Sequence, residues 1–406
     1  MKICQINCIY GEGSTGRIVR DLHHALTEKR YESVVIAPLA NRYTKQDGVY
    51  TVSNRFLDRL SAIYRRVSGH QYDGAFIQTN RILGILKKEK PDVVHLHCIN
   101  GNNINIYRLL RFLAKNKIKT VYTLHAEFPY TGGCGHAYDC RGWQTGCGHC
   151  PIRKEATQSV LFDRTKRTYR KLKKAYAFFD KGLLCFTAVS PWLLSRAASS
   201  PLIGDFPVYT VLNGVDATVF RPTSGEAVRE KLALAEGESM LFHATASFNP
   251  CADTLKGGRY IVELCQRLRE KGVRVVVAAN YGKIEDPPEN LSFVGRVASP
   301  KELAEYYAAA DLTVVVSKRE TFSMPTAESL SVGTPVVGFR AGGPESIASP
   351  ACSEFVEYGN LDALCEAIEK WLPFKRERGV NAEENIALYA KETMLENYMN
   401  VYQTFA

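Results

Sequence analysis

Short apolar runs separated by helix-like sequence recur along this chain and constrain its fold more than any other feature. In a parallel sheet covered on both faces, each strand reads as a continuous apolar run rather than an alternating one. The first half of the chain therefore predicts six buried parallel strands with helices between them. These runs are Lys2–Ile9, Ser33–Pro38, Asp92–His97, Thr120–His125, Leu183–Ser190 and Val208–Leu212.

The same pattern starts again after a polar break that runs from Asn213-Gly214-Val215-Asp216 through Gly225. Two successive arrays predict an α/β protein with two doubly wound, Rossmann-like domains that face each other across a cleft. We predict an N-terminal domain at 1–213, a C-terminal domain at 214–381, and a C-terminal helix at 382–406 that packs back towards the first domain. The later runs are Met240–Ala244, Val273–Ala279, Leu291–Val294, Leu312–Val316 and Pro335–Phe339.

The composition excludes several classes of protein. Of the 406 residues, 45% are hydrophobic and 23% are charged, which excludes a disordered chain, a collagen and a small disulfide scaffold. No stretch approaches the roughly 18 apolar residues of a membrane-spanning helix. The start, Met1–Cys8, is typical of a strand rather than of a signal peptide. We therefore expect a cytoplasmic protein whose 12 cysteines are thiols or metal ligands rather than disulfides.

The net charge of +10 is unevenly distributed. Residues 1–213 hold 32 Lys and Arg against 15 Asp and Glu, a balance of +17, whereas residues 214–406 have a balance of −7. Segment 153–181 holds ten of these cations, interleaved with apolar residues. A basic amphipathic helix is typical of membrane-surface binding, although an ordinary solvated face explains the segment alone equally well. We expect an anionic membrane surface as a partner, at the inner face of the cell membrane, and no nucleic acid.

Two glutamates follow the predicted strand Leu312–Val316, at the edge where open α/β sheets bind ligands. Glu320 stands in the loop and Glu328 in the next helix. Pro325 suits a helix start, so the backbone N–H groups of Phe322–Thr326 would form a phosphate or diphosphate site. The two carboxylates would accept hydrogen bonds from sugar or ribose hydroxyls. Spacing alone also fits a surface loop residue and a glutamate that favours the helix dipole.

The surrounding sequence gives the chain a family resemblance. The two glutamates are followed by Gly333-Thr334-Pro335-Val336 and preceded by Phe293-Val294-Gly295-Arg296-Val297 and Tyr307-Ala308-Ala309-Ala310-Asp311. With Asn213-Gly214-Val215-Asp216, this ordered set resembles the retaining glycosyltransferases of family 4, which have the GT-B fold. The resemblance covers nearly the whole chain. A Cys-rich insert at 131–151 is similar to that of an exopolysaccharide, colanic-acid-type subgroup.

The resemblance implies a role for each matching residue. Glu320 would contact the donor sugar, and Glu328 would hold the ribose hydroxyls. Lys256, in Thr254-Leu255-Lys256-Gly257, would neutralise the diphosphate. The donor would also contact the loop residues Thr321, Phe322, Ser323 and Met324, and its base would be bordered by Gly295, Arg296 and Val297.

One departure from the family pattern concerns the cation that usually accompanies the lysine. The family has an arginine about five residues upstream, where this chain has Phe248-Asn249-Pro250-Cys251-Ala252-Asp253. Either Arg296 or Arg319 supplies that charge, or Lys256 acts alone. A solvated lysine at a helix start is the alternative interpretation of Lys256, although lysine normally disfavours that position.

A glycine-rich loop, Tyr10–Arg17, follows the first predicted strand. Glycines allow tight turns and close backbone approach to a ligand, and Ser14 or Thr15 could cap the following helix. It is not a dinucleotide fingerprint, because no acidic residue ends the second strand. The resemblance implies that this loop, with Gly13, Ser14 and Gly16, lies under the donor diphosphate.

Two histidines end predicted strands, and a hydrogen-bonded structural role is the usual explanation for such residues. The family places a histidine after the strand that ends at His125, near the anomeric carbon of the donor sugar. We therefore predict a catalytic role for His125 and a structural role for His97.

Four cysteines lie within 17 residues: Cys134, Cys140, Cys147 and Cys150. Zinc takes four thiolates, and the two-residue spacer between Cys147 and Cys150 suits a zinc knuckle. The spacing of the first two is unusual, and His136 or His149 could replace a cysteine. Two disulfides, or free thiols packed in a loop, are the alternatives, so a structural zinc is one of three readings.

Taken together, the sequence predicts a retaining glycosyltransferase of the hexosyltransferase class. It would move a sugar from a UDP- or GDP-sugar to a lipid-linked oligosaccharide in cell-surface polysaccharide synthesis. No Asp-x-Asp motif is present, so metal-independent catalysis is expected, with Lys256 and the helix N-terminus stabilising the leaving diphosphate. The rival hypotheses are a non-catalytic, zinc-containing protein that binds nucleotide-sugars or anionic polymers, and a sugar-nucleotide epimerase.

Overall fold

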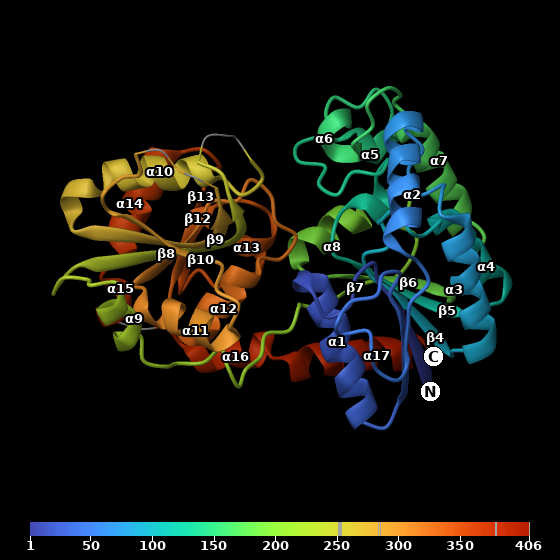
Figure 1. Cartoon of the computed structure of the whole chain (residues 1–406), viewed down its shortest axis with the longest axis horizontal. Helices are drawn as coiled ribbons and strands as arrows, with labels where there is room; N and C mark the ends of the chain where they lie inside the picture. The colour runs from blue at the N-terminus through green and yellow to red at the C-terminus, as the bar shows by residue number, and fades with distance from the viewer. Residues whose placement is uncertain (251–253, 283, 285, 378–379, 406) are drawn as a thin grey trace. The chain divides into compact units, whose positions relative to one another are not determined.

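The computed structural model describes residues 1–250, 254–282, 284, 286–377 and 380–405. The chain divides into two compact units, which we call the N-terminal unit (Met1–Leu212 with Leu395–Ala406) and the C-terminal unit (Asn213–Met394) (Figure 1). The predicted division after residue 213 lies next to the observed one. The C-terminal unit, however, extends beyond the predicted end at residue 381.

The N-terminal unit is built on a parallel seven-stranded sheet with strand order β3-β2-β1-β4-β5-β6-β7. Its central strands are buried along nearly their whole length, as the continuous apolar runs predicted. The sequence missed only β3, which is two residues long. The strands are β1 (Lys2–Ile6), β2 (Glu32–Ile36), β3 (Val49–Tyr50), β4 (Val93–Leu96), β5 (Lys119–Leu124), β6 (Leu184–Ala188) and β7 (Val208–Thr210).

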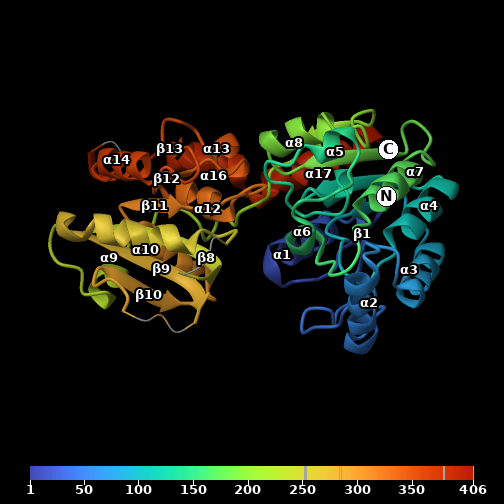
Figure 2. The same ribbon diagram turned by 90° about the horizontal axis from the view of Figure 1, so that it is seen from above.

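Helices cover both faces of this sheet (Figures 1 and 2). On one face α3, α4 and α7 pack in a row, and α17 lies on the other, where its Tyr402 and Tyr398 contact His95 and Thr123. The helices are α1 (Gly13–Glu28), α2 (Arg55–Ser68), α3 (Phe76–Glu89), α4 (Ile106–Lys115), η1 (Phe128–Tyr130), α5 (Gly142–Thr145), α6 (Arg153–Thr157), α7 (Thr165–Tyr176), α8 (Pro191–Ala198) and the end of α17 (Lys391–Phe405).

The C-terminal unit repeats the arrangement with a parallel six-stranded sheet of order β10-β9-β8-β11-β12-β13. All five predicted strands are present, and β13 is an additional edge strand. The strands are β8 (Ser239–Phe248), β9 (Val273–Tyr281), β10 (Leu291–Gly295), β11 (Leu312–Val315), β12 (Val336–Phe339) and β13 (Ser353–Val356). The helices are α9 (Glu226–Lys231), α10 (Gly258–Arg267), η2 (Arg269–Lys271), α11 (Pro300–Ala309), α12 (Met324–Val332), α13 (Gly343–Ile347), α14 (Leu361–Trp371), α15 (Phe374–Glu377) and α16 (Ala382–Tyr389).

The predicted single C-terminal helix at 382–406 is wrong, because the segment forms two helices. Ala390 has φ −57° and ψ 145°, which is not helical. The break allows Ala390 to pair with Val215: the Val215 N–H donates to Tyr389 O, and the Lys391 N–H donates to Val215 O. Helix α16 therefore stays in the C-terminal unit, while the end of α17 lies against the N-terminal sheet, where Tyr402 contacts His95.

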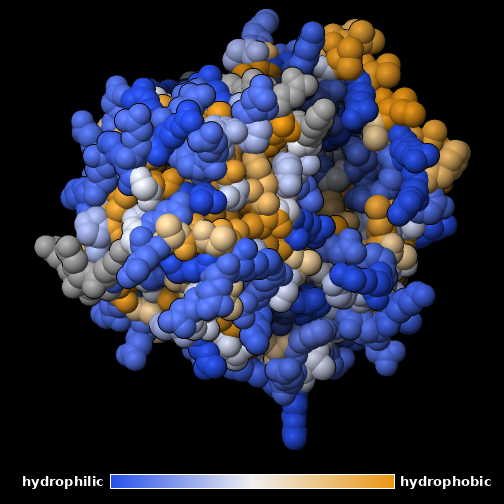
Figure 3. Space-filling model, turned by 60° about the vertical axis from the view of Figure 1, so that its left-hand side comes forward, coloured by the Kyte–Doolittle hydropathy of each residue, from blue (hydrophilic) through white to orange (hydrophobic). Residues whose placement is uncertain are grey.

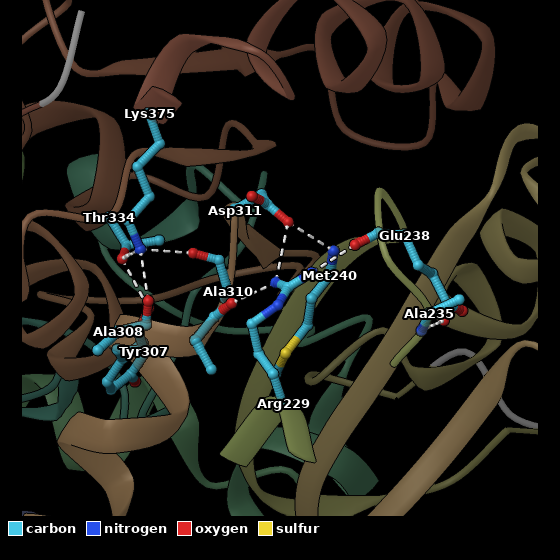
Figure 4. A network of polar contacts seen from close by, with 11 residues as sticks. Arg229, Ala235, Glu238, Met240, Tyr307, Ala308, Ala310, Asp311, Thr334 and Lys375 are labelled. Atoms are coloured by element: carbon cyan, nitrogen blue, oxygen red, sulfur yellow. Dashed lines mark hydrogen bonds and ion pairs between the residues drawn. The ribbon is translucent and has the colours of Figure 1, made fainter. Parts of the chain in front are cut away.

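A buried polar network holds the base of the C-terminal unit together, near the amino ends of its strands (Figure 4). The Lys375 ammonium donates to Ala308 O, Ala310 O and the Thr334 hydroxyl at 2.6–2.8 Å. Burial lowers the pKa of Lys375 to about 8. The Asp311 carboxylate accepts a hydrogen bond from the Met240 N–H at 2.8 Å. This network fixes the strands at the edge opposite the one where ligands of such sheets bind.

Candidate active site

An ion pair lies beyond the carboxyl ends of the C-terminal strands. The Lys256 ammonium contacts the Glu320 carboxylate at 2.5 Å, and the two side chains are 31% and 20% exposed. The structure thus brings together two residues that are 64 positions apart in the chain. Because both remain partly open to solvent, a ligand can reach the cation and the carboxylate.

Backbone contacts hold both partners of this pair in place. The turn that carries Lys256 is joined to the loop after β11 by a hydrogen bond from the Lys318 N–H to Leu255 O, at 2.9 Å. Gly257 follows with φ +66°, and a Cβ there would lie 2.1 Å from Val316 O, so only glycine fits. Glu320 pairs with Gly342 as an isolated parallel bridge. The carboxylate is therefore positioned by two strand-end loops rather than by one flexible segment.

Helix α12 begins at Met324, directly after the loop that carries Glu320. Its N-cap is Ser323, whose hydroxyl accepts a hydrogen bond from the Thr326 N–H at 3.4 Å. Ser323 has φ +90°, an uncommon conformation for a residue other than glycine and one that concentrates at functional sites. Phe322 is buried, and Thr321 and Met324 are half-buried. The predicted anion-binding N–H groups thus belong to a strained loop that leads into a nine-residue helix.

The second glutamate is held by a tyrosine. The Tyr307 hydroxyl of α11 donates to the Glu328 carboxylate at 3.1 Å. Burial, and then the charge of Glu328, raise the pKa of Tyr307 well above its usual value, so the phenol stays protonated as a donor. Glu328 is half-buried on the first turns of α12. A carboxylate has two oxygens with about four acceptor sites in all, so one held in this way can bind more than one donor.

The segment Gly295–Val297, which is predicted to border the nucleotide base, begins at the last residue of β10. Gly295 has φ +72°, and the register of β10 against β9 shifts between Phe293 and Gly295. This irregularity turns the chain outward, so Arg296 is exposed and Val297 is half-buried. Of the segment in place of the family arginine, Phe248–Asp253, the last three residues lie outside the described part of the chain, and Arg319 directly precedes Glu320 in the loop.

A histidine that the sequence did not reveal lies near the ion pair. His243 of β8 is buried, and its Nδ1 donates to Val314 O at 2.9 Å. Burial is the main cause that lowers its pKa to about 4, and the charges of Lys256 and Glu320 also act on it. Its Nε2 has no hydrogen-bond partner among the described residues. A neutral imidazole with a free lone pair therefore lies within the electrostatic field of the pair.

In the N-terminal unit, the glycine-rich loop leads into α1, which begins at Gly13. The predicted capping by Ser14 or Thr15 is wrong: both lie inside the helix, and its N-cap is Glu12, which makes no side-chain cap bond. Gly13 and Ser14 are exposed, whereas Gly16 is buried and its carbonyl accepts from the Gly11 N–H at 2.8 Å. The first turn of α1 thus presents uncapped N–H groups to solvent.

The structure joins the two strand-end histidines. His97 Nδ1 lies 3.1 Å from His125 Nε2, with the rings stacked at 5.4 Å. Burial lowers the pKa of His125 to about 4 and that of His97 well below its usual value, so both are neutral at pH 7. His95, which the sequence did not single out, lies against His97 with the rings tilted and their centroids 3.9 Å apart. Sequence spacing in Val94–His97 contained this signal, because alternate residues of a strand share a face.

The four cysteines of the insert line one small pocket together with Trp143 and Ile152. Every cysteine that the structure describes is a free thiol. Two thiols accept backbone hydrogen bonds: Cys147 Sγ from Gly132 at 3.0 Å and Cys140 Sγ from Gly142 at 3.4 Å. In the described ranges, no group of three or more His, Cys, Asp and Glu side chains is arranged to hold a metal ion.

A buried carboxylate that the sequence did not reveal anchors the insert. Glu127 is fully buried and accepts hydrogen bonds from Arg196 Nε at 2.7 Å, from the Tyr130 hydroxyl at 2.7 Å and from the Ala137 N–H at 2.6 Å. Three donors therefore satisfy one carboxylate, which ties the insert to α8.

The basic segment 153–181 forms two helices, α6 and α7, rather than one amphipathic helix. Tyr169, Leu172 and Tyr176 of α7 are buried in the unit, so they cannot face a membrane. The cations of α7 point outward around a hollow at the surface. Among the helices of the described residues, none is both long and apolar enough to cross a bilayer.

Two sequence families account for most of the chain. The family described as Glycosyltransferase Family 4 matches residues 15–219, about half of the chain, and the family described as Glycosyl transferases group 1 matches residues 245–373. Two successive Rossmann-like units, each built on a parallel sheet, are the architecture of the GT-B class of glycosyltransferases. The chain belongs to glycosyltransferase family 4, so the predicted fold class and family are confirmed.

Individual relatives agree with this assignment. The chain is 22% identical to the putative colanic acid biosynthesis glycosyl transferase WcaC of Escherichia coli (strain K12), over 99% of this chain and 100% of that protein. It is 29% identical to the MMP alpha-(1->4)-mannosyltransferase of Mycolicibacterium hassiacum, over 56% of each. The structure of Anabaena Alr3699/HepE in complex with UDP has a TM-score of 0.67 at 14% identity, with both chains covered completely.

Proposed function

We propose that this protein is a retaining glycosyltransferase of the hexosyltransferase class that takes a sugar from a UDP- or GDP-sugar. Its acceptor would be a lipid-linked oligosaccharide in cell-surface polysaccharide synthesis, at the cytoplasmic face of the cell membrane. Full-length similarity to a putative colanic acid biosynthesis glycosyl transferase supports this pathway. The UDP and UDP-glucose complexes of the HepE structures support the donor class.

The observation that carries the proposal is the pair formed by Lys256 and Glu320 at 2.5 Å. As the glycosidic bond of the donor breaks, negative charge grows on the leaving diphosphate. A cation and helix N–H groups fixed in advance stabilise that charge without reorganising. When the donor binds, the Lys256 ammonium exchanges a carboxylate oxygen for phosphate oxygens, and Glu320 becomes free to accept a hydrogen bond from a sugar hydroxyl.

The remaining residues orient the donor. Glu328, held by Tyr307, accepts hydrogen bonds from the ribose hydroxyls. His125 orients the donor sugar as a neutral imidazole, since burial lowers its pKa to about 4. Its ring is held in place by His97, whose Nδ1 lies 3.1 Å from His125 Nε2. Such positioning contributes to the rate by holding the reacting groups in a productive geometry.

Retention of configuration follows from attack on the face that the diphosphate leaves. The bond between the anomeric carbon and the phosphate oxygen breaks, and the acceptor oxygen bonds to the same face of that carbon. The acceptor hydroxyl passes its proton to the leaving phosphate. In this proposal Lys256 and the α12 N-terminus supply the positive charge, so turnover requires no divalent metal.

The experiment is a turnover assay with donor and a membrane extract as the source of acceptor, in which nucleoside diphosphate and glycosylated product are both quantified. Glu320→Gln removes the charge but keeps the shape, and we expect turnover to fall about 100-fold or more. Lys370→Met, at an exposed ion pair of the same unit, is the control and should leave turnover unchanged. The anomeric configuration of the product, read by proton NMR, tests retention, and addition of EDTA tests metal independence.

Different outcomes favour the rival functions. Donor binding without any product, in the unmodified protein, would favour a non-catalytic nucleotide-sugar-binding protein. Conversion of the donor into another nucleotide-sugar, with no acceptor present, would favour an epimerase. An inverted product would contradict the front-face mechanism.

We also propose that the insert holds one structural zinc ion on Cys134, Cys140, Cys147 and Cys150. The supporting observation is that all four thiols line one pocket. Two of the sulfurs also accept backbone N–H bonds, as metal-bound thiolates often do. The sulfurs would have to draw together to close a tetrahedral site. Zinc would then fix the insert beside η1 and would take no part in the chemistry.

The zinc proposal is tested by elemental analysis of the purified protein, followed by a thermal melt after chelation. We expect about one zinc per chain and a lower melting temperature after chelation, because a ligand that binds the folded state stabilises it. The double variant Cys147→Ser with Cys150→Ser should lose the metal. Cys352→Ser, a buried cysteine of the C-terminal unit, serves as the control. Absence of metal, with four free thiols by titration, would contradict the proposal.

A further inference from the structure

The helix α2 stands out because none of its 14 residues is buried. Its apolar side chains nevertheless lie on one face: at about 100° per residue, positions 56, 60, 63, 64 and 67 fall within an arc of about 100°. These side chains point to solvent, with exposed fractions of 68% for Phe56, 49% for Leu60 and 59% for Ile63. Tyr64 and Val67 are 42% and 52% exposed. The helix therefore turns its apolar face away from its own unit.

The opposite side of α2 attaches the helix to the unit. Asn103 Nδ2 donates to the Asp58 carboxylate at 3.2 Å, and Arg65 donates to Gln158 at 2.7 Å. Asp58 and Arg65 lie on the side of the helix away from the apolar arc. Because polar contacts fix the inward side, the outward apolar face cannot be explained as a core that failed to pack.

Neighbouring segments extend the apolar face. Val160, Leu161 and Phe162 are 58%, 59% and 48% exposed, and the Val160 N–H donates to Arg66 O at 3.0 Å. Phe76 and Ile77, at the start of α3, are also more than half exposed. In the space-filling view, exposed apolar side chains gather along the upper right edge (Figure 3). We call α2 together with 160–162 and 76–77 the apolar face.

Cations border the apolar face on two sides. Arg55, Arg59 and Arg66 are exposed and fall together along one edge of the α2 arc. At the end of α2, Gly69 lies against Phe162 O and the Arg164 side chain. There the hollow on α7 begins, which is lined by Asp163 and by the cations Arg164, Lys166, Arg167, Arg170, Lys171 and Lys174.

We propose that the apolar face docks the protein on an anionic lipid bilayer. Helix α2 lies in the plane of the interface with Phe56, Leu60, Ile63 and Val67 among the upper acyl chains, and lipid phosphates occupy the α7 hollow. At 14 residues α2 is about 21 Å long, too short to span a bilayer, and an apolar arc edged by arginine is typical of interfacial helices. The +17 charge balance of residues 1–213 favours an anionic leaflet over a protein partner of mixed charge.

This inference moves the predicted membrane contact from the basic segment 153–181 to α2. In that segment the apolar residues of α7 are buried, so α7 supplies charge only, and the inserting side chains come from a helix about 100 positions earlier in the chain. The docking does not depend on turnover, so it can fail or succeed separately from the proposed function.

The experiment is co-sedimentation of the full-length protein with vesicles of phosphatidylcholine, with or without phosphatidylglycerol. We expect binding only to the anionic vesicles, and weaker binding as salt rises, because salt screens the charges. The double variant Leu60→Asp with Ile63→Asp should bind at least about tenfold more weakly. The triple variant Arg55→Gln, Arg59→Gln, Arg66→Gln should lose the salt-dependent part of the vesicle binding.

The controls separate docking from misfolding. Leu388→Asp changes a leucine that is 45% exposed on α16 of the C-terminal unit, and it should bind vesicles like the unmodified protein. Circular dichroism and the donor-induced thermal shift should be the same for every variant. Equal binding of the Leu60→Asp, Ile63→Asp variant, or no preference for anionic vesicles, would overturn the proposal. So would a dimer that needs these residues and does not bind lipid, since the face would then join two copies of the chain.

Discussion

The two units share the order of their first six strands, with a seventh strand in the N-terminal unit, but they fill their sheets differently. In the N-terminal unit, hydrogen-bonded polar side chains cross the central strands: His95 Nε2 lies 2.6 Å from the Thr123 hydroxyl, which lies 2.6 Å from the Thr187 hydroxyl. Tyr402 of α17 completes the row with a 2.6 Å contact to His95 Nδ1. The centre of the C-terminal unit is instead an apolar cluster around Leu241, Val275, Val314 and Val337.

This difference indicates how each unit keeps its ligand-facing edge in place. Apolar side chains can be rearranged in a core without fixing one exact geometry. The C-terminal unit therefore fixes its ion pair through backbone contacts of glycine-rich loops. Hydrogen bonds are directional and costly to leave unmade, so the buried polar row of the N-terminal unit fixes its histidines directly. The N-terminal unit should accordingly be the more sensitive to loss of single polar atoms and to acid.

The largest expected effect is at Glu127. Glu127→Ala removes a fully buried carboxylate and leaves the 21% exposed Arg196, the Tyr130 hydroxyl and the Ala137 N–H without their acceptor, so we expect a loss of about 3–5 kcal/mol. The control is Glu369→Ala, which breaks an ion pair with Lys271 in which the two side chains are 46% and 47% exposed, and it should cost less than about 1 kcal/mol. Urea unfolding followed by fluorescence measures both. Similar costs for the two variants would contradict the comparison.

Acid should destabilise the protein through its buried histidines. The pKa of His125 is lowered to about 4 by burial, so the unfolded chain binds more protons between pH 4 and 6.5. Its stabilising contribution is complete above pH 6.5 and is lost as the pH falls towards 4. Between pH 7 and pH 5 this amounts to about 2 kcal/mol for one such histidine.

His243, whose pKa is also lowered to about 4, supplies the matching position in the C-terminal unit. Chemical unfolding at pH 7 and pH 5 should show a smaller pH dependence in His125→Gln and in His243→Gln than in the unmodified protein. Because His95 and His97 also have lowered pKa values, the N-terminal unit should lose more stability at pH 5. An unchanged stability between the two pH values would be inconsistent with neutral buried imidazoles.

The smallest effect is expected from removing one hydroxyl. Tyr402→Phe deletes the buried contact to His95 and should cost about 1 kcal/mol. Tyr306→Phe is its counterpart in the C-terminal unit, where the hydroxyl contacts the exposed Lys231 at 3.3 Å and no other side chain of the described residues, and it should be nearly neutral. Thermal melts distinguish the two. A larger loss from Tyr306→Phe would reverse the comparison between the units.

The strands could be predicted because their signal is local. Continuous apolar runs identify buried parallel strands, whereas β3 has two half-buried residues and β13, Ser353–Val356, is a short edge strand with little apolar content. The break at Ala390 could not be predicted, because its cause is pairing with Val215, which is 175 positions away. The capping prediction failed because α1 starts at a glycine before the serine.

The candidate site was predictable only where a motif marks it. Glu320, Glu328 and Lys256 belong to recognisable patterns, and the structure places the first and last of them in contact. Glu127 and His243 carry no such pattern, since their importance comes from burial and partners distant in sequence. The outward apolar face of α2 is visible in the helical periodicity, but only the fold shows that it turns to solvent.

The most direct test of the donor site is thermal stabilisation of the purified protein across UDP-, GDP- and ADP-sugars. A ligand that binds only the folded state raises the melting temperature by mass action. We predict a shift with the UDP- or GDP-sugars that is abolished in Glu328→Ala and reduced in Lys256→Met. No shift with any nucleotide-sugar, or a shift that both variants retain, would contradict the assignment of Lys256, Glu320 and Glu328 to the donor.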